Sequence, residues 1–224
     1  MCMSNKVVAW AAIVLLSLGA LQQQPAIAQE PKQEKAAAPE TDVEKKEREG
    51  RRKCAALICS TLHNKTPADG QVSCSVQKTW RKDSLSKVLS RAKVSWPWGD
   101  TRCSSELKLD RAMLIKAMHE PEFDAKFEDY GIRCQIDAAD PKKPDEKYDV
   151  TAQIKPQVSF KAGKAVKASL NWGKLEAPTL AKGVLWPITA ADNKLGLLQS
   201  IVVEDINEFV TTKCAEVKDE WQRK

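Results

Sequence analysis

The chain has 224 residues, of which 42% are hydrophobic and 29% are charged, and its net charge at pH 7 is +6. This length allows one hydrophobic core and favours a single folded domain. Lysine and arginine are interleaved with acidic residues along most of the sequence, which is typical of a mixed solvated surface. Composition and charge therefore exclude a phosphate-binding stripe and predict no nucleic-acid partner.

The first 28 residues have the features of a removable export signal. Lys6 precedes an uncharged apolar run at 7–21, and Ala-Ile-Ala at 26–28 places small side chains where a signal peptidase cuts. The run is shorter than the roughly 20 residues of a membrane-spanning helix, so no transmembrane segment is predicted in the mature chain. The mature protein is expected to begin near Gln29 and to be periplasmic or secreted.

Residues 29–42 are predicted to form a flexible tether, because they combine Pro, Ala, Gln and charged residues without an apolar face. The rest of the chain, 43–224, is predicted to be a single α+β domain. A capping box between Thr41 and Glu44 precedes apolar residues at helical spacing, which predicts a first helix that ends near Asn64. Gly50 is a candidate interruption of this helix.

Alternation of apolar and polar residues predicts strands after this helix. The segment at 72–76 has one apolar face, and a short helix is expected at 85–89. A second strand at 94–98 is expected to form a hairpin with the segment at 102–109. Pro97 cannot donate to a strand ladder, so that end of the strand is expected at a sheet edge or a bulge.

The middle of the chain mixes helical and strand patterns. Asp110 is expected to cap a helix over 113–118, and Phe123 and Phe127 would continue its apolar contact beyond the end of the helix. A strand follows at 132–136. The charged, proline-rich segment after this strand is expected to be an exposed loop.

The last third contains the clearest hairpin and the longest helical pattern. Alternating residues at 148–160 and 166–172 predict the two strands of the hairpin. Thr189 begins a capping signature, and apolar residues recur at helical spacing as far as Trp221, which predicts a long C-terminal helix. An unbroken helix would be longer than a small domain needs, so Gly196 is a candidate interruption.

Together these elements predict an α+β fold in which a single antiparallel sheet of about six strands packs on the long C-terminal helix. The domain also holds six of the seven cysteines: Cys54, Cys59, Cys74, Cys103, Cys134 and Cys214. Because an exported chain meets an oxidising compartment, they are predicted to form three structural disulfides. Cys54 and Cys59 lie about 140° apart around one helix, so each is expected to have a different partner, while the connectivity stays open.

Catalytic and metal-binding motifs are missing. The sequence has two histidines, His63 and His119, and they are not at zinc-ligand spacing, so no metal or cofactor is predicted. It has no Gly-x-Ser-x-Gly elbow. The acidic residues Glu120, Glu122 and Asp124 are interpreted as a surface turn. These features disfavour an enzyme, and a hydrolase whose carboxylates meet only in three dimensions is kept as an alternative.

Tryptophan is the feature that points to a function. Aromatic faces on a sheet stack on sugars or enclose apolar ligands. The candidate ligand-binding residues are Trp80, Trp96, Trp98 and Trp172, with Arg81 and Lys82 as a rim that tolerates anions. These residues favour a non-enzymatic binding module for an apolar small molecule, an envelope glycan or an envelope protein. The alternatives are that the tryptophans fill the core, or that the domain is a structural or inhibitor-like scaffold that recognises proteins.

Overall fold

A computed structural model describes residues 39–64, 67–91, 93–138 and 146–222 of the chain. These residues belong to one compact unit. The predicted export signal and the predicted tether up to residue 38 lie outside the described residues. Within the described ranges, none of the helices has both the length and the apolar character needed to cross a bilayer.

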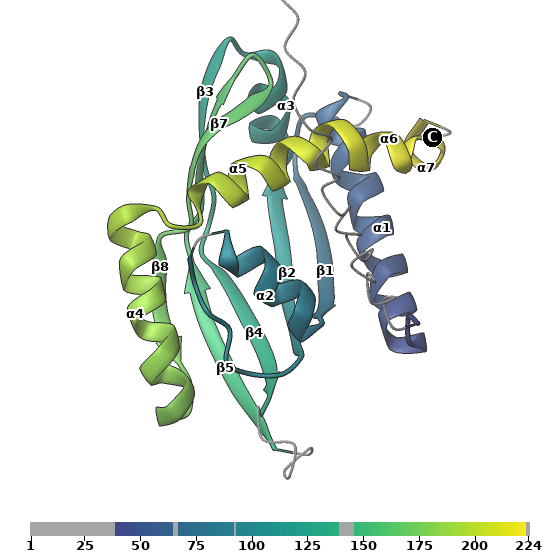
Figure 1. The fold of residues 1–224 in the computed structure, drawn as a ribbon. Helices are drawn as coiled ribbons and strands as arrows, with labels where there is room; N and C mark the ends of the chain where they lie inside the picture. The colour runs from purple at the N-terminus through teal and green to yellow at the C-terminus, as the bar shows by residue number, and fades with distance from the viewer. Residues whose placement is uncertain (1–38, 65–66, 92, 139–145, 223–224) are drawn as a thin grey trace, which may run out of the picture. The chain divides into compact units, whose positions relative to one another are not determined.

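The predicted α+β class is confirmed, but the strands form two antiparallel sheets (Figure 1). The larger sheet has the strand order β1-β2-β4-β5-β8, and the smaller sheet has the order β3-β6-β7. The strands described are β1 (Gln71–Trp80), β2 (Thr101–Asp110), β3 (Glu122–Lys126), β4 (Tyr130–Asp137), β5 (Lys147–Ile154), β6 (Gln157–Lys161), β7 (Lys164–Ser169) and β8 (Trp172–Glu176).

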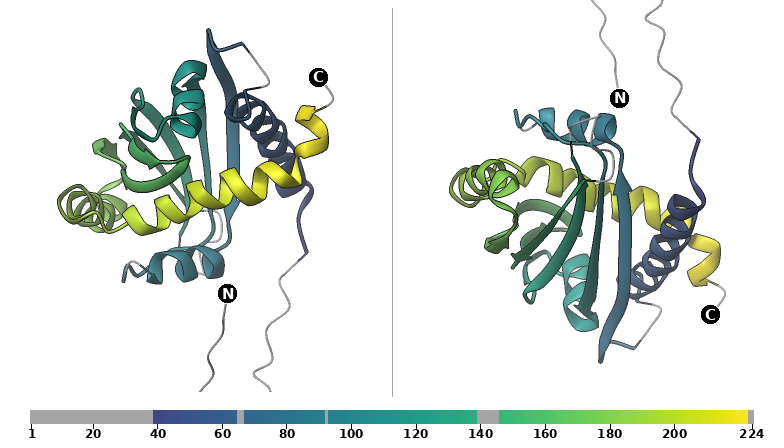
Figure 2. Two further views of the ribbon diagram at one scale, coloured as in Figure 1. Left: turned by 90° about the horizontal axis from the view of Figure 1, so that it is seen from above. Right: turned by 90° about the horizontal axis from the view of Figure 1, so that it is seen from below.

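Helices flank both sheets. They are α1 (Asp42–Leu62), α2 (Lys82–Ser90), α3 (Arg111–His119), α4 (Thr179–Leu195), α5 (Gln199–Glu208), the π-helix η1 (Phe209–Lys213), α6 (Cys214–Glu216) and α7 (Lys218–Gln222). Helix α1 packs beside β1, and α4 packs beside β8. Helix α5 packs on β7 and leads the chain back toward α1, as the views in Figures 1 and 2 show.

Two of the three predicted helix caps are present, and the third, at Thr189, is wrong. The Thr41 hydroxyl accepts a hydrogen bond from the Glu44 amide at 3.2 Å, and the Glu44 carboxylate accepts one from the Thr41 amide at 2.7 Å. Helix α1 then continues through Gly50 without a break. The Asp110 carboxylate accepts from the Met113 amide at 2.7 Å and begins α3. Local hydrogen bonding fixes these helix starts, which is why the sequence predicts them well.

The prediction of one sheet with about six strands is wrong, and Pro156 gives the reason. The hairpin predicted at 148–172 is divided, because β5 ends at Ile154 and β6 begins at Gln157. Proline has no amide proton for a strand ladder, and the Pro156 carbonyl instead accepts from the Phe127 amide at 3.0 Å. The base of the hairpin therefore belongs to the larger sheet and its tip to the smaller one. The segment containing Phe123 is also a strand, β3, and pairs with β6.

The prediction of a strand at 94–98 is also wrong. The described residues 93–100 form no strand, and β2 pairs instead with β1 along all ten residues of β1. The Gly99 amide donates to the Asp137 carbonyl, and the Asp137 amide donates to the Asp100 carbonyl, both at 2.9 Å. These bonds tie the segment to the end of β4. Pro97 cannot donate to a ladder, and the place beside β2 is already occupied by β1.

The predicted C-terminal helix is interrupted at Gly196, as expected. This glycine adopts a left-handed conformation with φ of +63°, which favours glycine and ends α4. Helix α4 begins at Thr179, well before the predicted start, so Thr189 lies inside the helix. The π-helix η1 follows α5, so that Val202 packs in the core of the smaller sheet while Val217 packs against α1.

The described residues form three disulfides, as predicted, and these are Cys54–Cys74, Cys59–Cys214 and Cys103–Cys134. The first joins α1 to β1, the second joins α1 to α6, and the third joins β2 to β4. Cys54 and Cys59 have different partners, in agreement with their angular separation on the helix. Three disulfides in one domain of this size are typical of an extracytoplasmic protein.

Asparagine side chains on helices bond the outer strands β8 and β7. The Asn193 side-chain oxygen accepts from the Trp172 amide, and its nitrogen donates to the Trp172 carbonyl, both at 2.7 Å. Asn207 of α5 makes the same pair of bonds with Ala165, both at 2.9 Å. Each asparagine thus takes the place that a neighbouring strand would occupy.

Side chains of helix α1 likewise form hydrogen bonds with the backbone of the outer strand β1. The Glu47 carboxylate accepts from the Thr79 amide at 2.7 Å and from the Thr79 hydroxyl at 3.1 Å. Arg51 donates to the Gln77 carbonyl at 2.6 Å. The Glu47 side chain is 3% exposed and also forms an ion pair with Arg102 at 2.7 Å. The buried Glu47 carboxylate therefore has both hydrogen-bond donors and a cation as partners, and these contacts hold α1 beside the sheet.

Candidate functional site

The apolar face of the larger sheet carries two separate groups of packed side chains. Alternation along the strands places the side chains of Val72, Leu109 and Tyr130 on this face. These three belong to a cluster formed with α1 and the C-terminal helices. A second cluster, which contains Trp98 and Leu175, packs against α4. The helices leave part of this face accessible beside the first cluster.

This accessible region is a groove of about 780 Å³, which we call the sheet groove. Helix α1, strands β1, β2 and β4, the π-helix η1 and α6 contribute to its walls. The volume lies within the roughly 300–1,000 Å³ of small-molecule sites. The apolar part of the lining consists of Ala55, Ile58, Val76, Trp80, Leu107, Ile132, Phe209 and Val217.

Cationic side chains surround this apolar lining. They are Arg48, Arg51, Arg52, Lys78 and Lys213. Arg48 is held by Glu40 through two hydrogen bonds of 3.0 and 3.1 Å. Arg52 forms an ion pair with Glu220. The charges of these two arginines are thus compensated by carboxylates of the same chain.

Two further cationic side chains of the groove also have partners within the chain. Arg51 donates to the Gln77 carbonyl and lies 4.0 Å from Glu47. Lys213 forms an ion pair of 3.0 Å with Glu216. Glu216 is the one carboxylate that the described lining of the groove contains.

Lys78 differs from the other four cations. It occupies the same face of β1 as Val76 and Trp80, and its ammonium lies 4.8 Å from the centroid of the Trp80 ring. Within the described part of the chain it forms no ion pair or hydrogen bond. The residue is exposed, yet the atoms around its ammonium displace enough water to lower its pKa, and the charge of Arg51 lowers it further.

The structure separates the tryptophans that the sequence singled out. Trp80 lines the sheet groove. The rings of Trp96 and Trp98 lie edge to face at 4.8 Å, and Trp98 is buried in the cluster beside α4. Trp172 also packs against that cluster, and its indole nitrogen donates to the Asp192 carboxylate at 2.8 Å. Three of the four therefore lie away from the groove.

Arg81 and Lys82 do not line the groove either. Arg81 forms an ion pair with Glu44 at 2.8 Å. Hydrogen bonds from Arg81 and then from Thr41 lower the pKa of Glu44 to about 2. The Lys82 amide donates to the Asp100 carboxylate at 2.8 Å. The two residues belong to the junction of β1 with α1 and α2.

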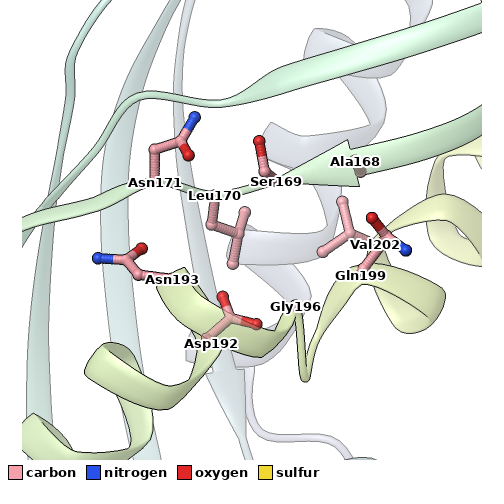
Figure 3. A pocket seen from close by; sticks show the side chains of 9 residues that line it. All are labelled: Ala168, Ser169, Leu170, Asn171, Asp192, Asn193, Gly196, Gln199 and Val202. Atoms are coloured by element: carbon pink, nitrogen blue, oxygen red, sulfur yellow. The ribbon is translucent and has the colours of Figure 1, made fainter.

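A polar pocket of about 20 Å³ lies where α4 meets α5 (Figure 3). Figure 3 shows the Leu170 side chain directed toward this junction. The Asp192 carboxylate is already bonded by the Trp172 indole at 2.8 Å and by the Leu198 amide at 2.7 Å. The space is about that of one water molecule, so the pocket is a structural junction.

A further depression of about 850 Å³ lies over α5 and the turn between β6 and β7. The sequence pattern predicts Val166 on the inward face, but a register shift between Ser159 and Phe160 leaves this valine 55% exposed. Asn207, which also borders the depression, is committed to the Ala165 backbone. The depression is bordered by fewer apolar side chains than the sheet groove.

No three His, Cys, Asp or Glu side chains come together as a metal site within the described ranges. The interpretation of the acidic residues as a surface turn is wrong for Glu122 and Asp124, which lie on β3, and Glu122 forms an ion pair with Lys161 at 2.8 Å. Comparison of the chain with protein-family models, curated proteins and solved structures gave no match.

Proposed function

We propose that this chain is a non-enzymatic binding module that holds an apolar small molecule in the sheet groove. The observation that carries the proposal is the groove itself, in which eight apolar side chains from helices and strands surround about 780 Å³. Transfer of an apolar ligand from water to such walls gains roughly 25 cal/mol per Å² of buried apolar surface. The walls are fixed by two disulfides, since Cys54 and Cys103 both line the groove.

The polar groups around the groove favour an apolar ligand over a glycan. A sugar needs uncommitted donors and acceptors, whereas Arg48, Arg51 and Arg52 already bond carboxylates or carbonyls of the chain. Acid–base hydrolysis needs a pair of carboxyl groups, and the described lining offers Glu216, which Lys213 holds. These features support binding rather than hydrolysis.

An interaction scaffold is the second candidate, and one observation favours it. Helix α4 exposes three large apolar side chains, those of Leu180, Trp186 and Leu195. Exposed apolar side chains of this size are available for contact with a partner protein. The binding experiment described below separates the two candidates.

We also propose that the protein works in the periplasm or outside the cell after removal of residues 1–28. Three disulfides support this location, because they persist in oxidising compartments. The intact mass of the protein recovered after export is expected to equal that of a chain beginning at Gln29 with three disulfides. A mass that retains residues 1–28 would contradict the proposed processing.

Binding of the neutral fluorophore N-phenyl-1-naphthylamine tests the proposed function. The probe carries no charge, so apolar contact alone decides its affinity. We expect saturable binding by the wild-type protein and about tenfold weaker binding by Val76→Gln, because the new amide lines the groove without a designed partner.

The control for this experiment is Val43→Gln, since Val43 is 48% exposed on α1 and lies outside the groove. The control is expected to bind the probe like the wild type. Lack of saturable binding by the wild-type protein would contradict the proposed function and leave the interaction scaffold as the better candidate. Equal weakening by both variants would also contradict a site in the groove.

A further inference from the structure

We propose that the ligand of the sheet groove carries one negative charge, that this charge pairs with Lys78 beside Trp80, and that the ligand is a single-chain amphiphile with a carboxylate head group. This inference rests on the proposed function and adds the chemical class of the ligand. Its basis is the distribution of charges around the groove.

The first step concerns which cation is free to meet a ligand. Arg48 and Arg52 are neutralised by Glu40 and Glu220, and Lys213 is neutralised by Glu216. Arg51 bonds the Gln77 carbonyl. Lys78 has no such partner among the described residues, and its ammonium lies over an aromatic ring that forms part of the apolar wall. An apolar chain against this wall would therefore bring its head group to Lys78.

The second step concerns the charges that face Lys78. The protonated form of Lys78 is disfavoured by the positive charges of Arg51 from α1 and Lys213 from η1. It is favoured by the negative charges of Asp205 and Glu208 from α5. Burial, and then the charge of Glu208, raise the pKa of Asp205. Both carboxylates lie beyond ion-pair distance of Lys78. A bound anion would thus supply the close contact that the protein itself does not.

The third step concerns the charge of the head group. Lysine offers one point charge, whereas arginine offers the planar fork that phosphate favours. The three arginines of the groove are already bonded, so the second charge of a phosphate monoester would find no second cation there. A carboxylate matches the one available cation.

The experiment compares three ligands that have the same number of carbon atoms and differ in the head group: dodecanoate, dodecanol and dodecyl phosphate. Each is titrated calorimetrically into the mature protein at pH 7. We expect dodecanoate to bind about tenfold more tightly than dodecanol, which is typical of one charge-assisted hydrogen bond at a partly exposed site. We expect dodecyl phosphate to bind no more tightly than dodecanoate.

Variants identify the cation. Lys78→Met keeps most of the aliphatic stem and is expected to remove the advantage of dodecanoate while leaving dodecanol binding unchanged. The matched control is Lys108→Met, on the opposite face of the same sheet, which is expected to keep the advantage. Because the pKa of Lys78 is lowered, the advantage should decline with rising pH before an ordinary lysine would lose its proton.

The outcomes separate the two proposals. If dodecanol and dodecanoate bind equally to the wild type, the charge inference is overturned and the proposed function stands. If neither binds, the proposed function fails and the inference fails with it. Tighter binding of dodecyl phosphate than of dodecanoate would overturn the assignment of a single charge. An unchanged preference for dodecanoate in Lys78→Met would overturn the assignment of the cation.

Discussion

Replacement of both Cys59 and Cys214 by alanine is expected to lower the free energy of unfolding by about 5 kcal/mol. The two residues are 155 positions apart, so their bond closes a long loop and removes many conformations from the unfolded chain. Both side chains are almost fully buried, at 0% and 1% exposure. Urea unfolding followed by tryptophan fluorescence would measure the loss.

The matched control is the double replacement of Cys103 and Cys134 by alanine. Their separation is 31 residues, so loop closure predicts a smaller loss of about 3.5 kcal/mol. A larger loss from this control than from the Cys59 and Cys214 pair would contradict the loop-closure explanation. It would instead assign the stabilisation to the local contacts of each bond.

Replacement of Glu47 by alanine is expected to lower the free energy of unfolding by about 3 kcal/mol. The change leaves the Thr79 amide and hydroxyl without their acceptor and removes the ion pair with Arg102. The carboxylate is 3% exposed, so water cannot replace these bonds in the intact fold. Chemical unfolding of the variant and the wild type would measure the difference.

Glu49→Ala is the matched control, because Glu49 is an exposed residue of the same helix. Its replacement is expected to change the free energy of unfolding by less than about 0.5 kcal/mol. The variant Glu47→Gln retains one acceptor and is expected to lie between the two alanine variants. A loss below about 1 kcal/mol for Glu47→Ala would show that the buried carboxylate does not hold α1 on the sheet.

The features that the sequence predicted correctly depend on residues close together in the chain. The capping box of Thr41 and Glu44, the cap at Asp110 and the interruption at Gly196 each involve neighbours within a few positions. The inward faces of β1, β2 and β4 also follow from simple alternation. The presence of disulfides followed from the cysteines and the export signal.

The errors concern choices that local patterns do not decide. The segment around Trp96 alternates like a strand, but β1 competes for the same edge of β2 and pairs with it over its full length. Pro156 and a bulge near Phe160 divide one alternating pattern between two sheets. Sheet membership depends on long-range pairing, which a single strand pattern does not contain.

The sheet groove could be predicted only in part. Trp80 was a candidate ligand-binding residue and lies in its wall, whereas Ile132 and Phe209 come from distant parts of the chain. A usable signal was present at Lys78, which places a charge on the inward face of β1 between Val76 and Trp80. A lysine at this position interrupts the alternation of apolar and polar residues along the strand.

The asparagine and glutamate contacts at the outer strands also limit how this protein could recognise other proteins. A peptide that adds to β8 or β7 by β-augmentation would compete with Asn193 or Asn207 for the same two backbone hydrogen bonds. At β1 it would have to displace the side chain of Glu47. Each helix therefore acts as a built-in competitor for strand addition, and loss of one such side chain would expose a template on which copies of the chain could aggregate.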